Sequence, residues 1–137
     1  VAMTTLILLL HKASVNNFQI LKAQELAVGL TEEISGRLWA ERGSSDDMIG
    51  IDTGEIEGDK TTFDDIDDFN GYEESPPCNP AGVPMADFSF FKRTVDVSYI
   101  KPEDIDSTEK TDLKRITVSV YRNGVLLVML KSLKSKH

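Results

Sequence analysis

The order of patterns along the chain predicts an α+β fold, in which a long N-terminal stem helix packs on a C-terminal antiparallel β-meander. Residues 1–42 contain no proline and carry apolar residues at helical spacing. Residues 43–92 are rich in turn-forming residues, and residues 93–137 alternate between apolar and polar positions. The chain has 137 residues, so we expect the stem and a globular head of residues 43–137 to form one domain.

The predicted helix begins with an apolar run that ends at His11 and Lys12. A membrane-spanning helix needs about 20 apolar residues, so we expect this run to be the end of a longer span. It is apolar on all sides, and such a helix is buried in a membrane or in another subunit. The residues assigned to this membrane and assembly segment are Val1, Met3, Leu6, Ile7, Leu8, Leu9 and Leu10.

The second half of the predicted helix is amphipathic. Its apolar residues recur at steps of three and four, which places them on one helical face. We expect this face to pack on a sheet of the same chain. It consists of Ile20, Ala23, Ala27, Leu30, Ile34 and Leu38, and the opposite side carries Lys22, Glu25, Glu32 and Arg37.

The middle segment, residues 43–92, shows little regular periodicity and contains many turn signals, such as Asn70-Gly71. Fifty residues without structure would be unusual within a compact domain. We therefore expect ordered loops with one or two short strands, and disorder in part of residues 43–62 is the alternative. The aromatic residues available to hold these loops to the core are Phe63, Phe69, Tyr72, Phe88, Phe90 and Phe91.

The C-terminal segment predicts three antiparallel strands, near residues 93–100, 114–122 and 125–132. The last two are separated by Asn123-Gly124, a pair that favours a type I′ hairpin turn because both central residues of that turn need a positive φ. We expect one face of the middle strand to contact the helix. That face consists of Ile116, Val118 and Val120.

The distribution of charge and of reactive side chains excludes several classes of function. Residues 41–80 hold thirteen acidic and two basic residues, whereas residues 101–137 have a net charge of +3. No basic stripe with interleaved aromatic residues exists, so we expect no nucleic-acid partner. Cys78 is the only cysteine, and the only histidines lie near the two ends of the chain, so a cysteine–histidine pair is not expected. We therefore do not expect an enzyme.

Four carboxylates lie within five residues of the acidic middle segment. They are Asp64, Asp65, Asp67 and Asp68. Their mutual repulsion is relieved when they bind a cation, backbone amides or basic side chains. One interpretation is a loose calcium site, because calcium takes six to eight oxygen ligands; no other cofactor is expected. The other is that the aspartates face solvent or organise turns by binding backbone amides, while Phe63, Ile66 and Phe69 are buried.

Three stretches of the chain resemble the type IV pilin and pseudopilin family, most closely its minor pilins. Residues 23–27, Ala-Gln-Glu-Leu-Ala, lead into Thr-Glu-Glu-Ile at 31–34 and look like the stem helix of that family. Residues 63–72 are similar to its aspartate-rich loop, which is followed here by Ser75-Pro76-Pro77. Residues 113–120 look like its late β-strand.

The resemblance implies a structural minor pilin or pseudopilin subunit of a type IV pilus or type II secretion filament. The apolar helix would lie in the bacterial inner membrane before assembly, with a periplasmic head, and then among other pilin or pseudopilin subunits in a cell-surface filament. The first residues do not match the processing junction of the family or the glutamate that follows it, so neither is assigned. The alternative is a periplasmic or extracellular module that binds a ligand or calcium without filament assembly.

Overall fold

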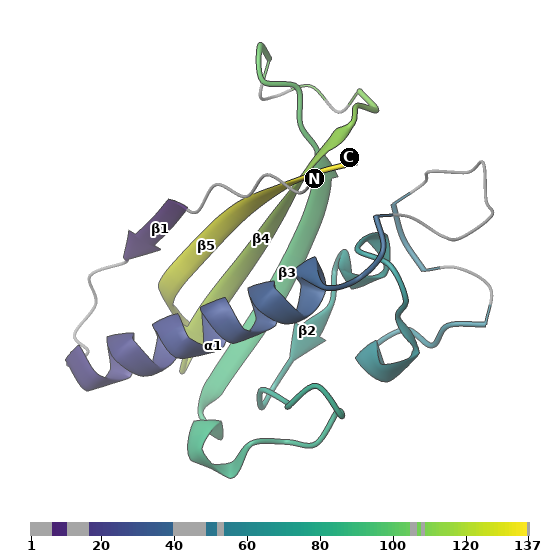
Figure 1. The fold of residues 1–137 in the computed structure, drawn as a ribbon. Coiled ribbons are helices and arrows are strands. Elements are labelled where there is room, and N and C mark those ends of the chain that lie inside the picture. Colours follow the sequence, from purple (N-terminus) through teal and green to yellow (C-terminus); the bar gives the residue numbers. More distant parts are fainter. Residues whose placement is uncertain are drawn as a thin grey trace.

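The computed structural model describes residues 7–10, 17–39, 49–51, 54–104, 107 and 109–136. Within them the chain forms one antiparallel sheet of five strands in the order β1-β5-β4-β3-β2, with helix α1 across one face (Figure 1). The strands are β1 (Ile7–Leu10), β2 (Glu73–Glu74), β3 (Phe91–Tyr99), β4 (Leu113–Arg122) and β5 (Val125–Ser135). The helices are α1 (Asn17–Ser35) and the short 3-10 helices η1 (Lys60–Thr62), η2 (Asp67–Phe69) and η3 (Ala86–Phe88).

The predicted fold class, with a long stem helix packed on a meander, is wrong. The helix has 19 residues, Asn17–Ser35, and the described chain is mostly sheet. The helix ends at Ser35, and Leu38 then forms an isolated parallel β-bridge with Asp65. Asp65 belongs to residues 64–68, which we call the acidic loop. Within the predicted stem of residues 1–42, the described residues therefore form a short strand and one helix of moderate length.

The apolar start of the chain provides a strand where a helix was expected. β1 pairs antiparallel with β5, with Ile7 opposite Lys131 and Leu10 opposite Val128. A short run of apolar residues suits a buried strand as well as a helix, and periodicity cannot distinguish the two. The edge of β5 supplies backbone hydrogen-bond partners along the whole length of β1, which decides the outcome in favour of the strand.

The three predicted C-terminal strands are confirmed. β3 and β4 pair over nine residues each, from Phe91 opposite Arg122 to Tyr99 opposite Lys114. β4 turns into β5 at the predicted hairpin, where Asn123 has a φ of 51° and Gly124 a φ of 78°. Both central residues thus adopt the left-handed conformation that a type I′ turn requires.

The core lies between α1 and the sheet. The predicted apolar face of the helix is largely confirmed, because Ala23, Ala27, Leu30 and Ile34 are buried together with Leu26. Across from them, the predicted face of β4 is fully buried and belongs to the same core. It consists of Ile116, Val118 and Val120. Two helix-face predictions fail in part, since Ile20 is half-buried and Leu38, which lies beyond the end of the helix, is exposed.

The described part of the middle segment consists of ordered loops held by aromatic side chains, as predicted. Phe63, Phe69 and Tyr72 contact one another edge to face, with ring centroids 4.9 to 5.8 Å apart. This cluster joins the core beneath the acidic loop. Phe90 is an exception to the expected pinning, because its ring is exposed.

Candidate functional site

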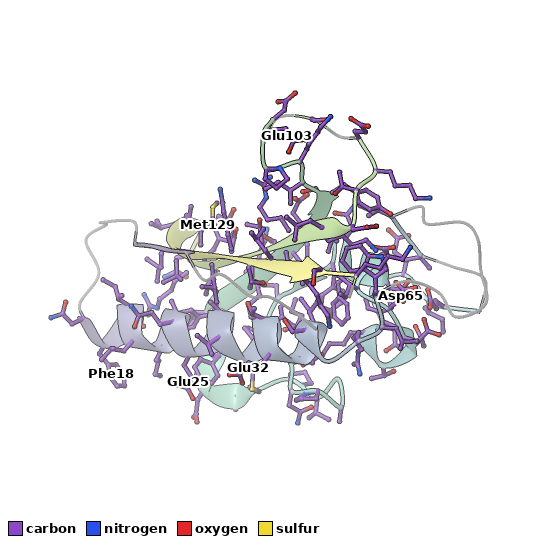
Figure 2. The ribbon with its side chains drawn as sticks, turned by 45° about the horizontal axis from the view of Figure 1, so that its top comes forward. Phe18, Glu25, Glu32, Asp65, Glu103 and Met129 are labelled. Carbon is purple, nitrogen blue, oxygen red and sulfur yellow. The ribbon has the colours of Figure 1, made fainter. Side chains whose placement is uncertain are left out.

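The aspartates of the acidic loop were expected to face solvent or to bind turn amides, and three of the four are buried. Asp64 is exposed, but Asp65, Asp67 and Asp68 retain only 0, 2 and 1 % of their accessible surface. The predicted anchors Phe63, Ile66 and Phe69 are buried, which confirms that half of the prediction. Figure 2 shows Asp65 in the crowded region beyond the C-terminal end of α1, where the loops meet the sheet.

Backbone amides within the loop bind two of the buried carboxylates. Asp68 Oδ2 accepts hydrogen bonds from the amides of Asp64 and Asp65, each at 3.0 Å. Asp65 Oδ1 accepts one from the amide of Asp68 at 3.2 Å. These bonds organise the turn into η2, so the predicted turn-forming role is confirmed for these two aspartates.

A lysine from the sheet neutralises the third buried carboxylate. Lys114 Nζ lies 2.8 Å from Asp67 Oδ1, and neither side chain reaches the surface. The same ammonium donates to the carbonyl oxygen of Trp39 at 2.7 Å and lies 4.2 Å from the centroid of the Trp39 ring. The loop is therefore attached to β4 by charge as well as by aromatic packing.

Two of the predicted metal residues approach each other, together with Glu55, which was not among the predicted metal residues. Glu55, Asp64 and Asp68 each place a carboxylate oxygen within 4.8 Å of those of the others. Asp65 and Asp67 are not part of this cluster. Glu55 lies nine residues before Asp64 in an irregular loop, where spacing carries no information about contacts.

A second set of buried charges connects α1 to β2 and β3. Lys60 Nζ lies 3.1 Å from Glu33 Oε1 and 2.7 Å from Glu74 Oε1, and Arg93 pairs with the other oxygen of Glu74. Tyr72 donates its hydroxyl to Glu74 at 3.0 Å. Burial alone would raise the pKa of Glu74, but the bonds from Lys60 and the charge of Arg93 hold it below the ordinary value. Glu74 is therefore ionised at neutral pH.

Cys78 lies beside this network and lines a cavity of about 230 Å³, together with Leu26, Glu33 and Phe88. Burial and the nearby Glu74 raise the pKa of the Cys78 thiol, so it stays protonated at neutral pH. A protonated thiol is a poor nucleophile, because the thiolate is the reactive form. The surroundings of Cys78 thus favour a packing role.

The side of α1 that faces away from the sheet carries three exposed apolar side chains among the charged residues Lys22, Glu25 and Glu32. Phe18 and Leu21 each expose 61 % of their surface and Val28 exposes 42 %. At about 100° per residue these three positions lie opposite the buried face of the helix. Phe18 and Glu25 point away from the sheet in Figure 2. We call the surface formed by Phe18, Leu21, Lys22, Glu25 and Val28 the outer face of α1.

A surface hollow of about 500 Å³ adjoins the N-terminal half of this outer face. It lies between α1 and η3, with Phe18, Leu21, Asp87 and Phe88 in its lining. Lys22 lies 4.9 Å from the ring centroid of Phe18 and 5.6 Å from that of Phe88. The hollow therefore presents aromatic rings beside a cation, and it extends the apolar surface beyond the helix.

The predicted membrane and assembly segment is only partly described. Val1, Met3 and Leu6 lie outside the described residues, and Ile7–Leu10 form β1. Among the described helices, none combines the length and apolar character needed to cross a bilayer.

Comparisons of the chain with protein-family models, with curated proteins and with solved structures found no match.

Proposed function

We propose that this chain is a structural subunit of a type IV pilus or type II secretion filament, and that it binds neighbouring pilin or pseudopilin subunits through the outer face of α1. The observation that carries the proposal is the pair of apolar side chains Phe18 and Leu21 near the start of α1, which each expose 61 % of their surface. It acts either at the bacterial inner membrane with a periplasmic head or in a cell-surface filament.

A helix that covers one side of a sheet ordinarily presents a polar opposite side. Phe18 and Leu21 are neighbours on the helix, and adjacent exposed apolar side chains favour a site of protein interaction. Burying a Phe or Leu side chain stabilises an association by about 1.5–3 kcal/mol. Packing of a neighbouring helix against Phe18, Leu21 and Val28 would therefore supply a substantial part of the association free energy.

The resemblance to minor pilins adds support, because the three stretches that carry it meet in one core. Residues 23–34 supply the buried face of α1, residues 63–72 supply the aromatic cluster, and residues 113–120 lie in β4. Ile7–Leu10 lie in β1 and not in a helix. The surface that binds other subunits is therefore assigned to the outer face of α1.

A site-specific crosslink tests this proposal. A photo-reactive amino acid at position 21, in cells that make the protein, should crosslink to another pilin or pseudopilin subunit, which mass spectrometry of the adduct identifies. The same probe at Asn123, on the exposed hairpin tip, is the matched control and should give less of that adduct. Adducts only with proteins outside a filament, or equal yields from both positions, would contradict the proposal.

A pair of phenylalanine variants separates assembly from folding. Phe18→Asp should reduce the amount of the protein recovered in sheared filaments, while its thermal unfolding stays close to that of the wild type. Phe90→Asp changes another exposed ring, outside α1, and should leave incorporation unchanged. Equal incorporation of the two variants would remove the outer face of α1 from the interface.

A further inference from the structure

We infer that Glu55, Asp64 and Asp68 form a binding site for one calcium ion. Their carboxylate oxygens lie within 4.8 Å of one another. Oxygen ligands bind calcium at 2.3–2.6 Å, so ligands on opposite sides of the ion are about 4.6–5.2 Å apart. A single ion between the three carboxylates is therefore compatible with this spacing.

The second observation is an unsatisfied oxygen on the most buried member of the cluster. Asp68 is 1 % exposed, and its Oδ2 is occupied by two backbone amides. Its Oδ1 is buried and has no hydrogen-bond partner within the described residues. A buried carboxylate oxygen without a partner is costly, and a bound cation would offset that cost.

Two buried lysines, Lys60 and Lys114, are engaged with other carboxylates. Lys114 pairs with Asp67, and Lys60 pairs with Glu33 and Glu74. Within the part of the chain that the structure describes, neither Asp64 nor Asp68 forms an ion pair with a lysine or arginine. The sheet thus supplies a counter-ion for Asp67, and among the described residues Asp68 has none.

The surroundings of the cluster suit calcium among the divalent ions. All three side chains offer oxygen, which hard cations prefer, and the cluster contains no histidine or cysteine. Asp68 also lines a cavity of about 290 Å³ together with Glu57, Asn70 and Glu73. Calcium accepts six to eight oxygen ligands, waters included, in a flexible geometry, whereas magnesium requires a stricter octahedron.

Calcium titration of the full chain, after treatment with a chelator, tests the inference by isothermal titration calorimetry. We expect one ion per chain and a rise in the melting temperature with calcium. Magnesium should bind at least tenfold more weakly. The assay uses the isolated protein, so its outcome does not depend on the proposed filament function.

Two variants at the partly accessible positions locate the ion without disturbing the buried turn. Glu55→Gln and Asp64→Asn should each weaken calcium binding at least tenfold. Asp96→Asn, an exposed acid on β3, is the matched control and should bind like the wild type. Asp68→Asn should abolish binding, and circular dichroism checks that this variant is folded.

Two outcomes would overturn the inference. One is the absence of any binding up to about 10 mM calcium, well above the dissociation constants of weak extracellular sites. The other is calcium binding that persists unchanged in the Glu55→Gln/Asp64→Asn double variant, which would place the ion elsewhere.

Discussion

Lys114 on β4 and Asp67 in the acidic loop form an ion pair of 2.8 Å with both side chains buried. The two residues lie far apart in the sequence, and their contact joins the loop to the start of β4, the central strand of the sheet. Tyr99 adds a second ring near the same ammonium, with its centroid 5.4 Å from Nζ. The pair is therefore buried among aromatic rings, where the loss of either partner strongly lowers the stability of the folded state.

Removing the lysine should destabilise the protein strongly. Lys114→Met leaves Asp67 buried with its counter-ion gone, and breaking such a pair costs about 3–5 kcal/mol. Urea denaturation followed by circular dichroism measures the loss. Lys101→Met, which breaks the exposed pair with Glu109, is the control and should change stability little. Similar losses in both variants would show that burial of the Lys114 pair does not matter.

Two glycine substitutions should change stability in opposite directions. Gly124 has a φ of 78°, so Gly124→Ala forces an L-residue into the left-handed region at a cost of about 1–2 kcal/mol. Gly29 lies within α1, and an added methyl group would meet no atom within 4 Å. Gly29→Ala should therefore stabilise the isolated chain by about 0.5–1 kcal/mol. Chemical denaturation of both variants checks the signs, and a destabilised Gly29→Ala would contradict the open space around it.

Acid should weaken the network around Glu74. Its pKa lies below the ordinary value of 4.5 in the folded protein, so the unfolded chain binds more protons between the two values. The stability that Glu74 provides is present above pH 4.5 and is lost as the pH falls through the folded pKa. Denaturation at a series of pH values should show a flatter acid limb for Glu74→Gln than for the wild type. If the stability of Glu74→Gln and of the wild type fell equally with decreasing pH, the protonation of Glu74 would not account for the loss of stability in acid.

A charge in the core should unfold the domain. Val118 is fully buried on β4 in the core beneath α1, so Val118→Asp places an unpaired carboxylate there at a cost of several kcal/mol. We expect no cooperative thermal transition in this variant. Val125→Asp, at an exposed position on the next strand, should melt close to the wild type. A normal melt of Val118→Asp would show that the core assignment is wrong.

The sheet was predictable because its signals are local. Alternating apolar residues predicted the burial of Ile116 and Val120, and Asn123-Gly124 located the hairpin. The apolar start was mispredicted because Ile7–Leu10 suit either a strand or a helix. Its partner, β5, lies more than a hundred residues later, and only the assembled sheet provides that edge.

The acidic loop was half predictable for a similar reason. Apolar residues at steps of three indicated the buried anchors Phe63, Ile66 and Phe69. The burial of Asp67 depends on Lys114, and the approach of Glu55 to Asp64 depends on the path of an irregular loop. Neither contact can be predicted from the spacing of residues within the loop. The sequence therefore suggested a cation but did not identify the residues that would bind it.

The position of β5 in the sheet affects the folding of the nascent chain during its synthesis. β5 lies between β1 and β4 in the sheet and follows every other described element in the sequence, so neither neighbour has its full set of strand partners until β5 has been synthesised. Until then the buried face of α1 lacks part of the sheet that covers it, and incomplete chains with exposed apolar surface tend to aggregate. The nascent chain should therefore depend on chaperones until β5 emerges from the ribosome, and slow translation of β5 should lower the yield of soluble protein.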